Sequence, residues 1–247
     1  MAEEQVLYNS VAPLRNVASL MELIERVQNR SPSLPGMACF HGPSGYGKST
    51  AATFAENKYQ AVRVQVQSTW TPKKFCQVIS LEMGLKPART VCDMVDDICA
   101  QLVYLDAPLL IDEADYLVRR KMVEIARDIY EGSGASVIFI GEELLPQKLA
   151  QWERVHGRMM AWTAAEPGVM ADLNHLASIY AQGVILGDNL KKVLLKASGG
   201  SIRRICTNLD AVATYAQTRG LESVSLAQWQ GQDFHNGVAP SPRRLAS

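Results

Sequence analysis

The chain has 247 residues, which is long enough for one large domain or two smaller ones with a substantial core. Hydrophobic residues make up 47% and charged residues 20%, and no apolar stretch reaches membrane-spanning length, so we expect a soluble, cytoplasmic protein without a membrane partner. The charges of the 25 basic and 25 acidic residues cancel, so a nucleic-acid-binding surface must come from local clusters. The five cysteines are scattered and form no C-x-x-C pair, which argues against a zinc site and a disulfide framework.

The first predicted element is an amphipathic helix near residues 16–27. Its apolar side chains recur at helical spacing, and Asn16 or Ser19 is the candidate N-cap. The breaker cluster at residues 31–36 ends this helix and leads into a short apolar strand over residues 37–40.

A phosphate-binding loop follows this strand. It consists of Gly42, Pro43, Ser44, Gly45, Tyr46, Gly47, Lys48, Ser49 and Thr50, which match G-x-x-x-x-G-K-[ST], and a helix-compatible run follows. The glycines let successive amides turn toward one point, and the first-turn N–H groups of the helix attract an anion there. Lys48 would neutralise the β- and γ-phosphates of ATP, and the Ser49 hydroxyl would bind Mg²⁺. Because strand and helix flank the loop, nucleotide binding is favoured over a chance glycine-rich turn.

Alternation of apolar and polar residues predicts a second strand over residues 61–66. Two helices follow, over residues 72–83 and 91–102. Pro72 opens the first of them, and Gly84 closes it.

The second informative stretch is the apolar run 108–111, which ends in Asp112 and Glu113. This is the Walker B pattern of a buried parallel strand, whose carboxyl end lies where ligands bind in α/β sheets. Asp112 would bind Mg²⁺ through water, and Glu113 would polarise the attacking water. The alternative is a buried strand that ends in a solvated acidic turn.

Strands and helices continue to alternate after Walker B. We predict helices over residues 120–131 and 145–152 and strands over residues 136–140 and 159–162. The fold class is therefore α/β, a doubly wound parallel sheet of five strands. Only helical periodicity recurs afterwards. We thus predict a nucleotide-binding α/β domain over residues 1–165, a small all-helical lid domain over 166–236, and a disordered tail over 237–247.

Together these motifs resemble the AAA+ ATPases. In the predicted lid, residues 199–204 resemble the sensor 2 motif of that superfamily. The resemblance implies that Arg203 would contact the γ-phosphate. The alternative is a glycine-capped junction between two helices. Residues 153–158 stand where the superfamily carries an arginine finger that completes a neighbouring subunit's site. Arg158 is the first candidate for this catalytic role and Arg154 the second, and surface arginines without a role are the alternative.

One residue departs from the superfamily pattern. Glu142 stands at the sensor 1 position, where Asn, Thr or Ser is usual. A carboxylate near the γ-phosphate would repel it unless the carboxylate binds metal, water or an arginine. Slow hydrolysis is therefore expected, and a scaffold that binds ATP and hardly hydrolyses it stays open as an alternative.

Within AAA+, residues 111–115 and 137–141 and the compact lid look most like the ATPases that select transposition targets, such as phage Mu transposition protein B and the TnsC/TniB group. That resemblance implies a homo-oligomer, either a helical filament or a ring, that assembles with ATP on duplex DNA and recruits a transposase. The matching DNA-binding residues are Lys73, Lys74, Arg119, Arg120 and Lys121. They would hold phosphates without reading bases, unless they only form a solvated face.

Two other AAA+ types remain as alternatives. A protein-directed ATPase of the ExeA type normally carries a membrane span and a peptidoglycan-binding part, for which the sequence shows no pattern. A helicase-loader-like or initiator-like ATPase would also assemble around nucleic acid.

Overall fold

The computed structural model describes residues 14–238. The chain divides into two compact units, the first ending at Glu166 and the second beginning at Pro167. The predicted domain boundary, between residues 165 and 166, lies next to this division. The predicted tail lies outside the described residues from residue 239 onward.

The first unit contains a five-stranded parallel sheet. Its strands are β1 (Met37–His41), β2 (Val62–Gln65), β3 (Leu109–Asp112), β4 (Val137–Gly141) and β5 (Met159–Ala164), in the order β2-β3-β4-β1-β5. Every residue of β3 and β4 is buried, which explains why both read as continuous apolar runs and not as alternating ones. The predicted doubly wound parallel sheet is confirmed.

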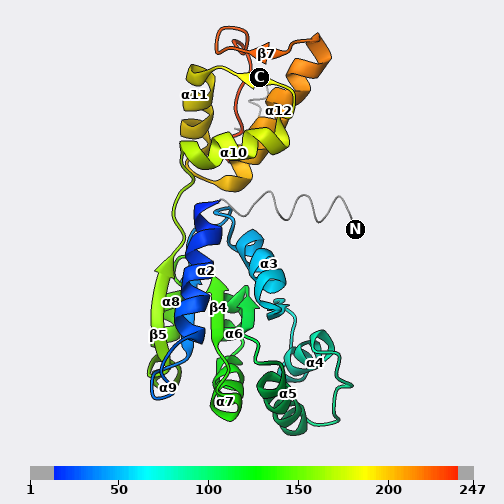
Figure 1. Ribbon diagram of the computed structural model, residues 1–247, viewed down its shortest axis with the longest axis vertical. Helices are drawn as coiled ribbons and strands as arrows, with labels where there is room; N and C mark the ends of the chain where they lie inside the picture. The colour runs from blue at the N-terminus through cyan, green and yellow to red at the C-terminus, as the bar shows by residue number, and fades with distance from the viewer. Residues whose placement is uncertain (1–13, 239–247) are drawn as a thin grey trace, which may run out of the picture. The chain divides into compact units, whose positions relative to one another are not determined.

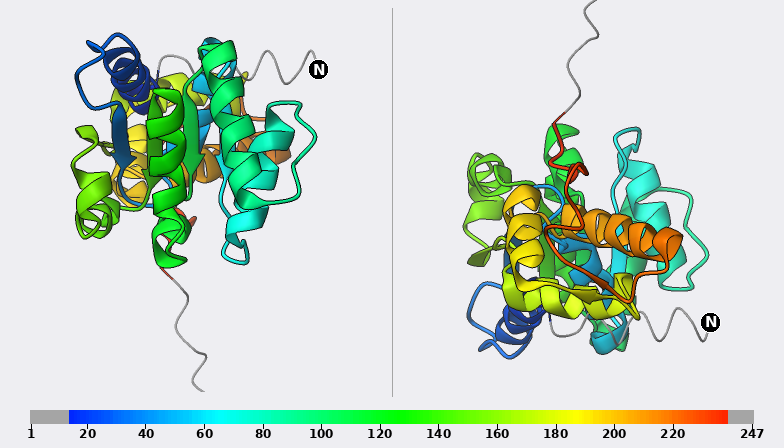
Figure 2. Two further views of the ribbon diagram at one scale, coloured as in Figure 1. Left: turned by 90° about the horizontal axis from the view of Figure 1, so that it is seen from below. Right: turned by 90° about the horizontal axis from the view of Figure 1, so that it is seen from above.

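Helices cover both faces of this sheet. They are α2 (Arg15–Gln28), α3 (Lys48–Tyr59), α4 (Pro72–Glu82), α5 (Val91–Leu105), α6 (Ala114–Arg119), α7 (Val123–Ser133), α8 (Leu145–Ala150) and α9 (Glu153–His156). Met37 and Cys39 of β1 point into one core with apolar residues of α4, α5 and α7, because alternate strand residues face opposite sides. The helices α2 and α3 contact each other and the strands from the other side (Figure 1). Figure 2 shows α5 and α7 side by side over the sheet.

Three local predictions are wrong. The helix predicted over residues 120–131 begins only at Val123, as α7, because Lys121 adopts a left-handed conformation (φ 56°) after a separate short helix, α6, that was not predicted. The helix predicted over 145–152 ends at Ala150, since Trp152 has ψ 87°, which is not helical, and a separate short helix, α9, follows it. Asn16 is not the N-cap of α2, because the helix already begins at Arg15 and the side chain of Asn16 bonds elsewhere.

Between Pro167 and residue 238, the second unit contains three helices and one short pair of strands. The elements are α10 (Met170–Tyr180), β6 (Ile185–Leu186), α11 (Asp188–Ser198), α12 (Ile202–Arg219) and β7 (Ser223–Val224). The parallel β6–β7 pair corrects the all-helical prediction, because segments of two residues are too short to show a period. The side chain of Trp229 is buried between the rings of Tyr215 and Phe234, each with its centroid 5.1 Å away.

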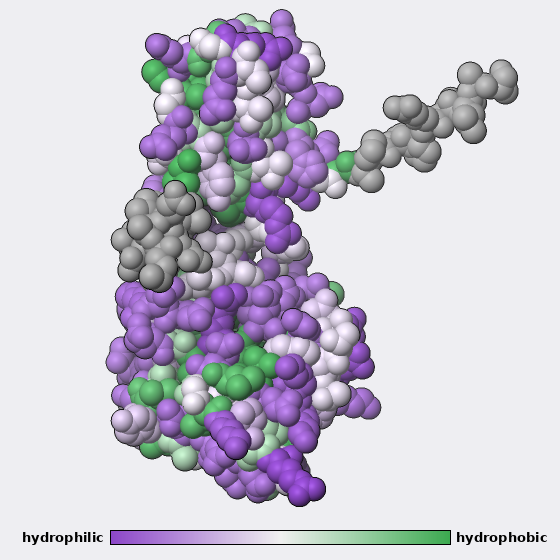
Figure 3. Space-filling view, turned by 90° about the vertical axis from the view of Figure 1, so that its right-hand side faces the viewer, coloured by the Kyte–Doolittle hydropathy of each residue, from purple (hydrophilic) through white to green (hydrophobic). Residues whose placement is uncertain are grey.

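On the face that Figure 3 shows, most residues are hydrophilic. Figure 3 shows one face on which hydrophobic residues of the first unit form a smaller area among hydrophilic ones. Among residues 14–238, no helix combines the length and the apolar character that crossing a membrane requires.

Candidate functional site

The predicted site residues converge because of strand order. The strands β3, β4 and β1 are parallel neighbours, so the segments that follow them begin at one edge of the sheet. These segments are the phosphate loop after β1, Asp112 and Glu113 at the end of β3, and Glu142 after β4. The backbone N–H of Gly42 donates to the carbonyl oxygen of Gly141 at 3.3 Å, which joins the phosphate loop to the end of β4.

The phosphate loop turns at two glycines. Gly45 (φ 85°) and Gly47 (φ 83°) adopt left-handed conformations that side chains with a Cβ rarely take, and Gly47 directly precedes α3. No side chain caps the first turn of α3, so its N–H groups are available to an anion. The Lys48 ammonium donates to the carbonyl oxygens of Gly42 (2.6 Å) and Pro43 (2.9 Å), which holds the loop closed on itself.

Four carboxylates act electrostatically on the Lys48 ammonium. Burial lowers the pKa of Lys48, and the negative charges of Glu113, Asp112, Asp115 and Glu142 act in the opposite direction. This edge of the sheet therefore carries more negative than positive charge. A polyphosphate bound there requires further positive charge, which a divalent cation would supply.

An arginine that sequence reasoning missed holds the Walker B aspartate. Arg63 of β2 donates through Nη2 to Asp112 Oδ2 at 3.0 Å and through Nη1 to Thr53 Oγ1 of α3 at 2.9 Å, and it pairs with Glu56 at 3.4 Å. The side chains of Asp112 and Arg63 are only 3% and 16% exposed. The alternation of β2 could have indicated this, because it places Arg63 on the face opposite the buried valines.

The donor set fits Mg²⁺ only in part. The Ser49 hydroxyl and the Asp112 carboxylate are oxygen ligands of the kind Mg²⁺ prefers. Both oxygens of Asp112 already accept hydrogen bonds, from Arg63 and from the Glu113 N–H (2.9 Å), which suits contact through water. Residues 14–238 contain no cluster of three His, Cys, Asp or Glu that could hold a metal ion. The cation would therefore depend on phosphate oxygens for most of its ligands, and it would supply neutralisation of their charge.

Glu113 is set apart by its backbone and its surroundings. Its left-handed conformation (φ 56°) starts α6 directly after β3. Burial raises the pKa of Glu113, and the charge of Asp112 adds to this effect. A pocket of about 450 Å³, lined by Glu113, Tyr116 and residues 65–68, opens beside the carboxylate. A carboxylate with a raised pKa next to an open pocket suits a general base.

Glu142 lies in an ion network that sequence reasoning missed. The Lys148 ammonium of α8 lies 2.5 Å from Asp115 Oδ1 and 3.5 Å from Glu142 Oε2. Asp115 Oδ2 in turn accepts the Glu142 N–H at 2.7 Å. A Cβ at Gly141 would clash with the Asp115 carboxylate and approach the Leu145 side chain to 2.7 Å. The network therefore joins the ends of β3 and β4 and requires glycine between them.

Asn16 fixes the phosphate loop from the other side. Its side-chain N–H₂ donates to the carbonyl oxygens of Tyr46 and Glu166, both at 2.8 Å, and its Oδ1 accepts the Glu166 N–H at 2.9 Å. The side chain is almost completely buried. Asn16 thus ties the loop to the last residue of the first unit. No local pattern indicates this contact, because it joins residues far apart in the chain.

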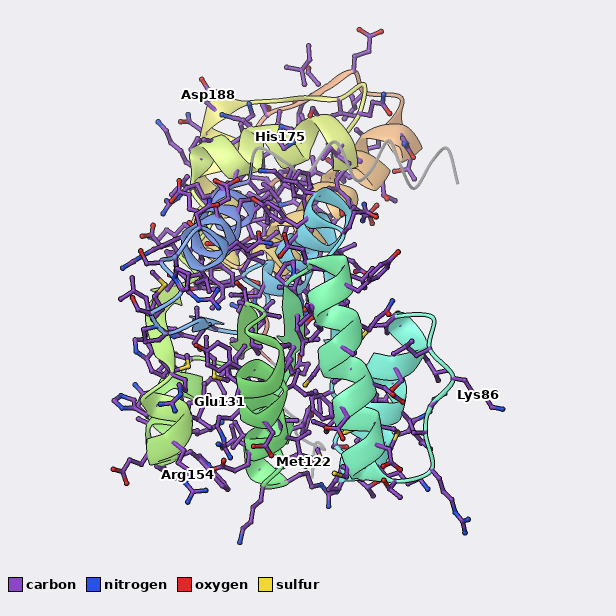
Figure 4. All side chains as sticks on the ribbon, turned by 60° about the horizontal axis from the view of Figure 1, so that its bottom comes forward. Lys86, Met122, Glu131, Arg154, His175 and Asp188 are labelled. Atoms are coloured by element: carbon purple, nitrogen blue, oxygen red, sulfur yellow. The ribbon has the colours of Figure 1, made fainter. Side chains whose placement is uncertain are left out.

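The candidate finger arginines do not reach this chain's own phosphate loop. Arg158 precedes β5 at the amino edge of the sheet, where its carbonyl accepts the Met37 N–H (3.0 Å), and its guanidinium pairs with Glu131 of α7. Arg154 is exposed on α9, and Figure 4 shows its side chain and Glu131 at this end of the first unit. Arg203 is exposed on α12 of the second unit, which is described by itself.

The two predicted basic clusters lie on adjoining segments. Lys73 and Lys74 are exposed in the first turn of α4, and Arg119 to Lys121 end α6. The Arg120 Nε–H donates to the Ser68 carbonyl oxygen at 2.8 Å, which ties the end of α6 to the loop that leads into α4. The Arg119 guanidinium lies over the Tyr116 ring, 4.7 Å from its centroid.

Comparisons with known proteins agree with this arrangement. Residues 30–149 match the model of a family described as an AAA domain. The Orc1 protein of Aeropyrum pernix, solved in complex with DNA, has a similar structure with a TM-score of 0.64 and 18% sequence identity, over 87% of this chain and 63% of that one. Cdc6p from Pyrobaculum aerophilum gives a TM-score of 0.59 and 13% identity, over 84% and 62%. No curated protein matches the chain.

The fold class predicted from the sequence is therefore confirmed. Residues 30–149 match the AAA domain family, and the chain shares its fold with the Orc1 and Cdc6p structures. It spans less than two thirds of the length of either similar structure. Neither comparison bears on the narrower resemblance to the transposition group.

Proposed function

We propose that the protein is an ATP-dependent, DNA-binding AAA+ ATPase that assembles on duplex DNA and regulates transposition. The phosphate loop, residues 42–50, would hold the phosphates of ATP, with Ser49 and Asp112 positioning Mg²⁺. Glu113 would take the proton of the water that attacks the γ-phosphorus, while the bond from that phosphorus to the ADP oxygen breaks. The convergence of these groups at one sheet edge supports this assignment.

The single observation that carries DNA binding is the bond between Arg120 and Ser68. It holds the two basic segments next to each other, and the pocket beside Glu113 includes Ser68 as well. Lys73, Lys74, Arg119 and Lys121 would contact backbone phosphates, so binding should tolerate any sequence and weaken with salt. The Orc1 protein, which shares the fold, was solved in complex with DNA, so this fold is compatible with bound DNA.

The placement of the finger candidates supports assembly into a filament or ring. Arg154 and Arg158 lie at the α9 end of the first unit and not at its phosphate loop. An arginine so placed would act on the phosphate loop of a second copy, and head-to-tail contacts of this kind generate helices or rings. Arg154 is the better candidate of the two, because Arg158 is paired with Glu131. Arg203 of α12 would contact the γ-phosphate in the same assembly.

Transposition is the narrowest part of the proposal. It is supported by the sequence resemblance around Walker B and β4, which implies a transposase as the partner of the DNA-bound assembly. The five unpaired cysteines suit a reducing cytoplasm. A helicase-loader-like or initiator-like ATPase is the second candidate, favoured by the similarity in fold to Orc1 and Cdc6p.

Electron microscopy of the full chain with duplex DNA tests the proposal. Samples with ATP, a non-hydrolysable analogue or ADP are compared, and Lys48→Ala serves as the variant without phosphate binding. We expect filaments or stacked rings on DNA with ATP and the analogue, and none with Lys48→Ala. Rings that do not bind the DNA would instead indicate a protein-directed ATPase of the ExeA type. Filaments alone do not distinguish a transposition regulator from a helicase-loader-like or initiator-like ATPase. A second experiment therefore tests whether the protein pulls down a transposase or a replicative helicase.

A further inference from the structure

The carboxylate of Glu142 is close to the place where a γ-phosphate would lie. Glu142 follows Gly141, which is paired with His41, the residue before the phosphate loop. Its negative charge acts on Lys48 and on Glu113. A negative side chain in this position opposes a nucleoside triphosphate more than a diphosphate, because only the triphosphate extends its charge to the γ-position.

Lys148 is the cation that faces this carboxylate. Among residues 14–238, it is the only basic side chain that forms an ion pair with Glu142. Its ammonium does not simply extend into solvent, since the Asp115 carboxylate, whose side chain is only 11% exposed, holds it at 2.5 Å. Lys148, Glu142 and Glu113 all line a second pocket, which also has a volume of about 450 Å³ and is distinct from the one formed with residues 65–68. The lysine is therefore fixed between the Walker B segment and the end of β4.

We propose that Lys148 is a positioning residue that neutralises Glu142 and so allows the site to prefer ATP over ADP. The inference rests on the proposed nucleotide binding and deepens it. In this chain an acid–base pair replaces the neutral polar side chain expected after β4. Asp115 orients the lysine, and Lys148 holds the Glu142 carboxylate on its own side of the pocket.

The proposal makes a selective prediction for nucleotide affinity. In Lys148→Met the Glu142 charge has no counterion, so affinity for a non-hydrolysable ATP analogue should fall about tenfold, while affinity for ADP stays within about twofold. Glu142→Gln should raise the preference for the ATP analogue over ADP. Because the two changes remove opposite charges from one pair, Lys148→Met/Glu142→Gln should return the preference to near the wild-type value.

Equilibrium titration of the full chain with fluorescent ADP and the ATP analogue measures these affinities without hydrolysis. Each titration is run with and without Mg²⁺, and thermal unfolding confirms that every variant is folded. Lys148→Arg keeps the charge and should behave as wild type. Lys86→Met is the matched control, because Lys86 is exposed in the loop before α5 and extends away from the fold (Figure 4).

Three results would overturn the inference and leave the proposed function standing. Equal loss of both nucleotides in Lys148→Met would mean that the lysine is only structural. Selective loss that Glu142→Gln does not restore would mean that Lys148 acts on the phosphate itself and not through Glu142. An unchanged preference in Glu142→Gln, which is a mild exposed substitution, would contradict the inference even if Lys148→Met failed to fold. Wild-type protein that binds neither nucleotide would defeat the proposed function, and the inference with it.

Discussion

Two acid–base pairs lie on either side of the Walker B strand β3, one toward β2 and one toward β4, and they differ in burial. On the β2 side, the side chains of Asp112 and Arg63 are 3% and 16% exposed. On the β4 side, those of Glu142 and Lys148 are 66% and 37% exposed. A buried ion pair is costly to break because the remaining charge has no solvent, whereas an exposed pair contributes little to stability and rearranges easily. The first pair therefore fixes the Walker B strand, whereas in the second pair Asp115 holds Lys148 and the exposed Glu142 carboxylate is the member that can respond to a ligand.

The largest effect is expected from breaking the buried pair. Arg63→Met leaves the Asp112 carboxylate buried without its partner and should lower the free energy of unfolding by about 3–5 kcal/mol. Urea unfolding monitored by circular dichroism measures this change. Arg63→Met/Asp112→Asn, which removes the uncompensated charge, should recover part of the loss. A single variant within about 1 kcal/mol of wild type would show that the pair is not structural.

The contact between the Asp115 carboxylate and the end of β4 can be broken at Gly141. A side chain there would clash with the Asp115 carboxylate, so Gly141→Ala should lower stability by about 1–3 kcal/mol through overpacking. Chemical denaturation measures the loss, and nucleotide titration should show a weaker preference for ATP over ADP. Gly134→Ala is the control for glycine replacement, since a Cβ at this helix end meets no neighbouring atom and costs only its left-handed backbone. Equal losses in both variants would argue against the clash.

The third prediction concerns Glu113, which lies beside the buried pair, and the pH dependence of protein stability that its carboxylate causes. Its folded-state pKa is raised by burial and by Asp112, so the folded protein binds this proton more tightly than the unfolded chain does. Ionisation of Glu113 above its folded pKa therefore lowers the stability of the wild-type protein. At about pH 7.5, Glu113→Gln should unfold at a higher temperature than wild type. The gain should disappear as the pH falls to the ordinary value of 4.5. A gain that grows toward acid pH would contradict this sign.

The smallest effect on stability is expected from the exposed pair. Glu142→Gln should change the free energy of unfolding by less than about 0.5 kcal/mol, because solvent already screens the carboxylate. The same denaturation experiment as for Arg63→Met gives a direct comparison. A loss above about 2 kcal/mol would place Glu142 with the structural pair and not with the adaptable one.

Local patterns predicted the elements that carry the proposed nucleotide chemistry. The loop from Gly42 to Thr50 needs glycines and a following helix, and both are consecutive in the chain. The buried strands β3 and β4 are short apolar runs with clear ends. Prediction was poorer at the ends of α6 and α8, where single residues such as Lys121 leave helical conformation for reasons that no periodicity reveals.

By itself, the sequence determined the five strands and the helices between them, the phosphate loop and the Walker B acids. Each of these depends on residues within one segment of the chain. Only the tertiary structure decided which charges oppose these acids. Arg63 meets Asp112, and Lys148 meets Glu142 and Asp115, across strand and helix boundaries. Long side chains reach partners several ångströms away, and which partners lie in reach is set by strand order and helix packing, not by position along the chain.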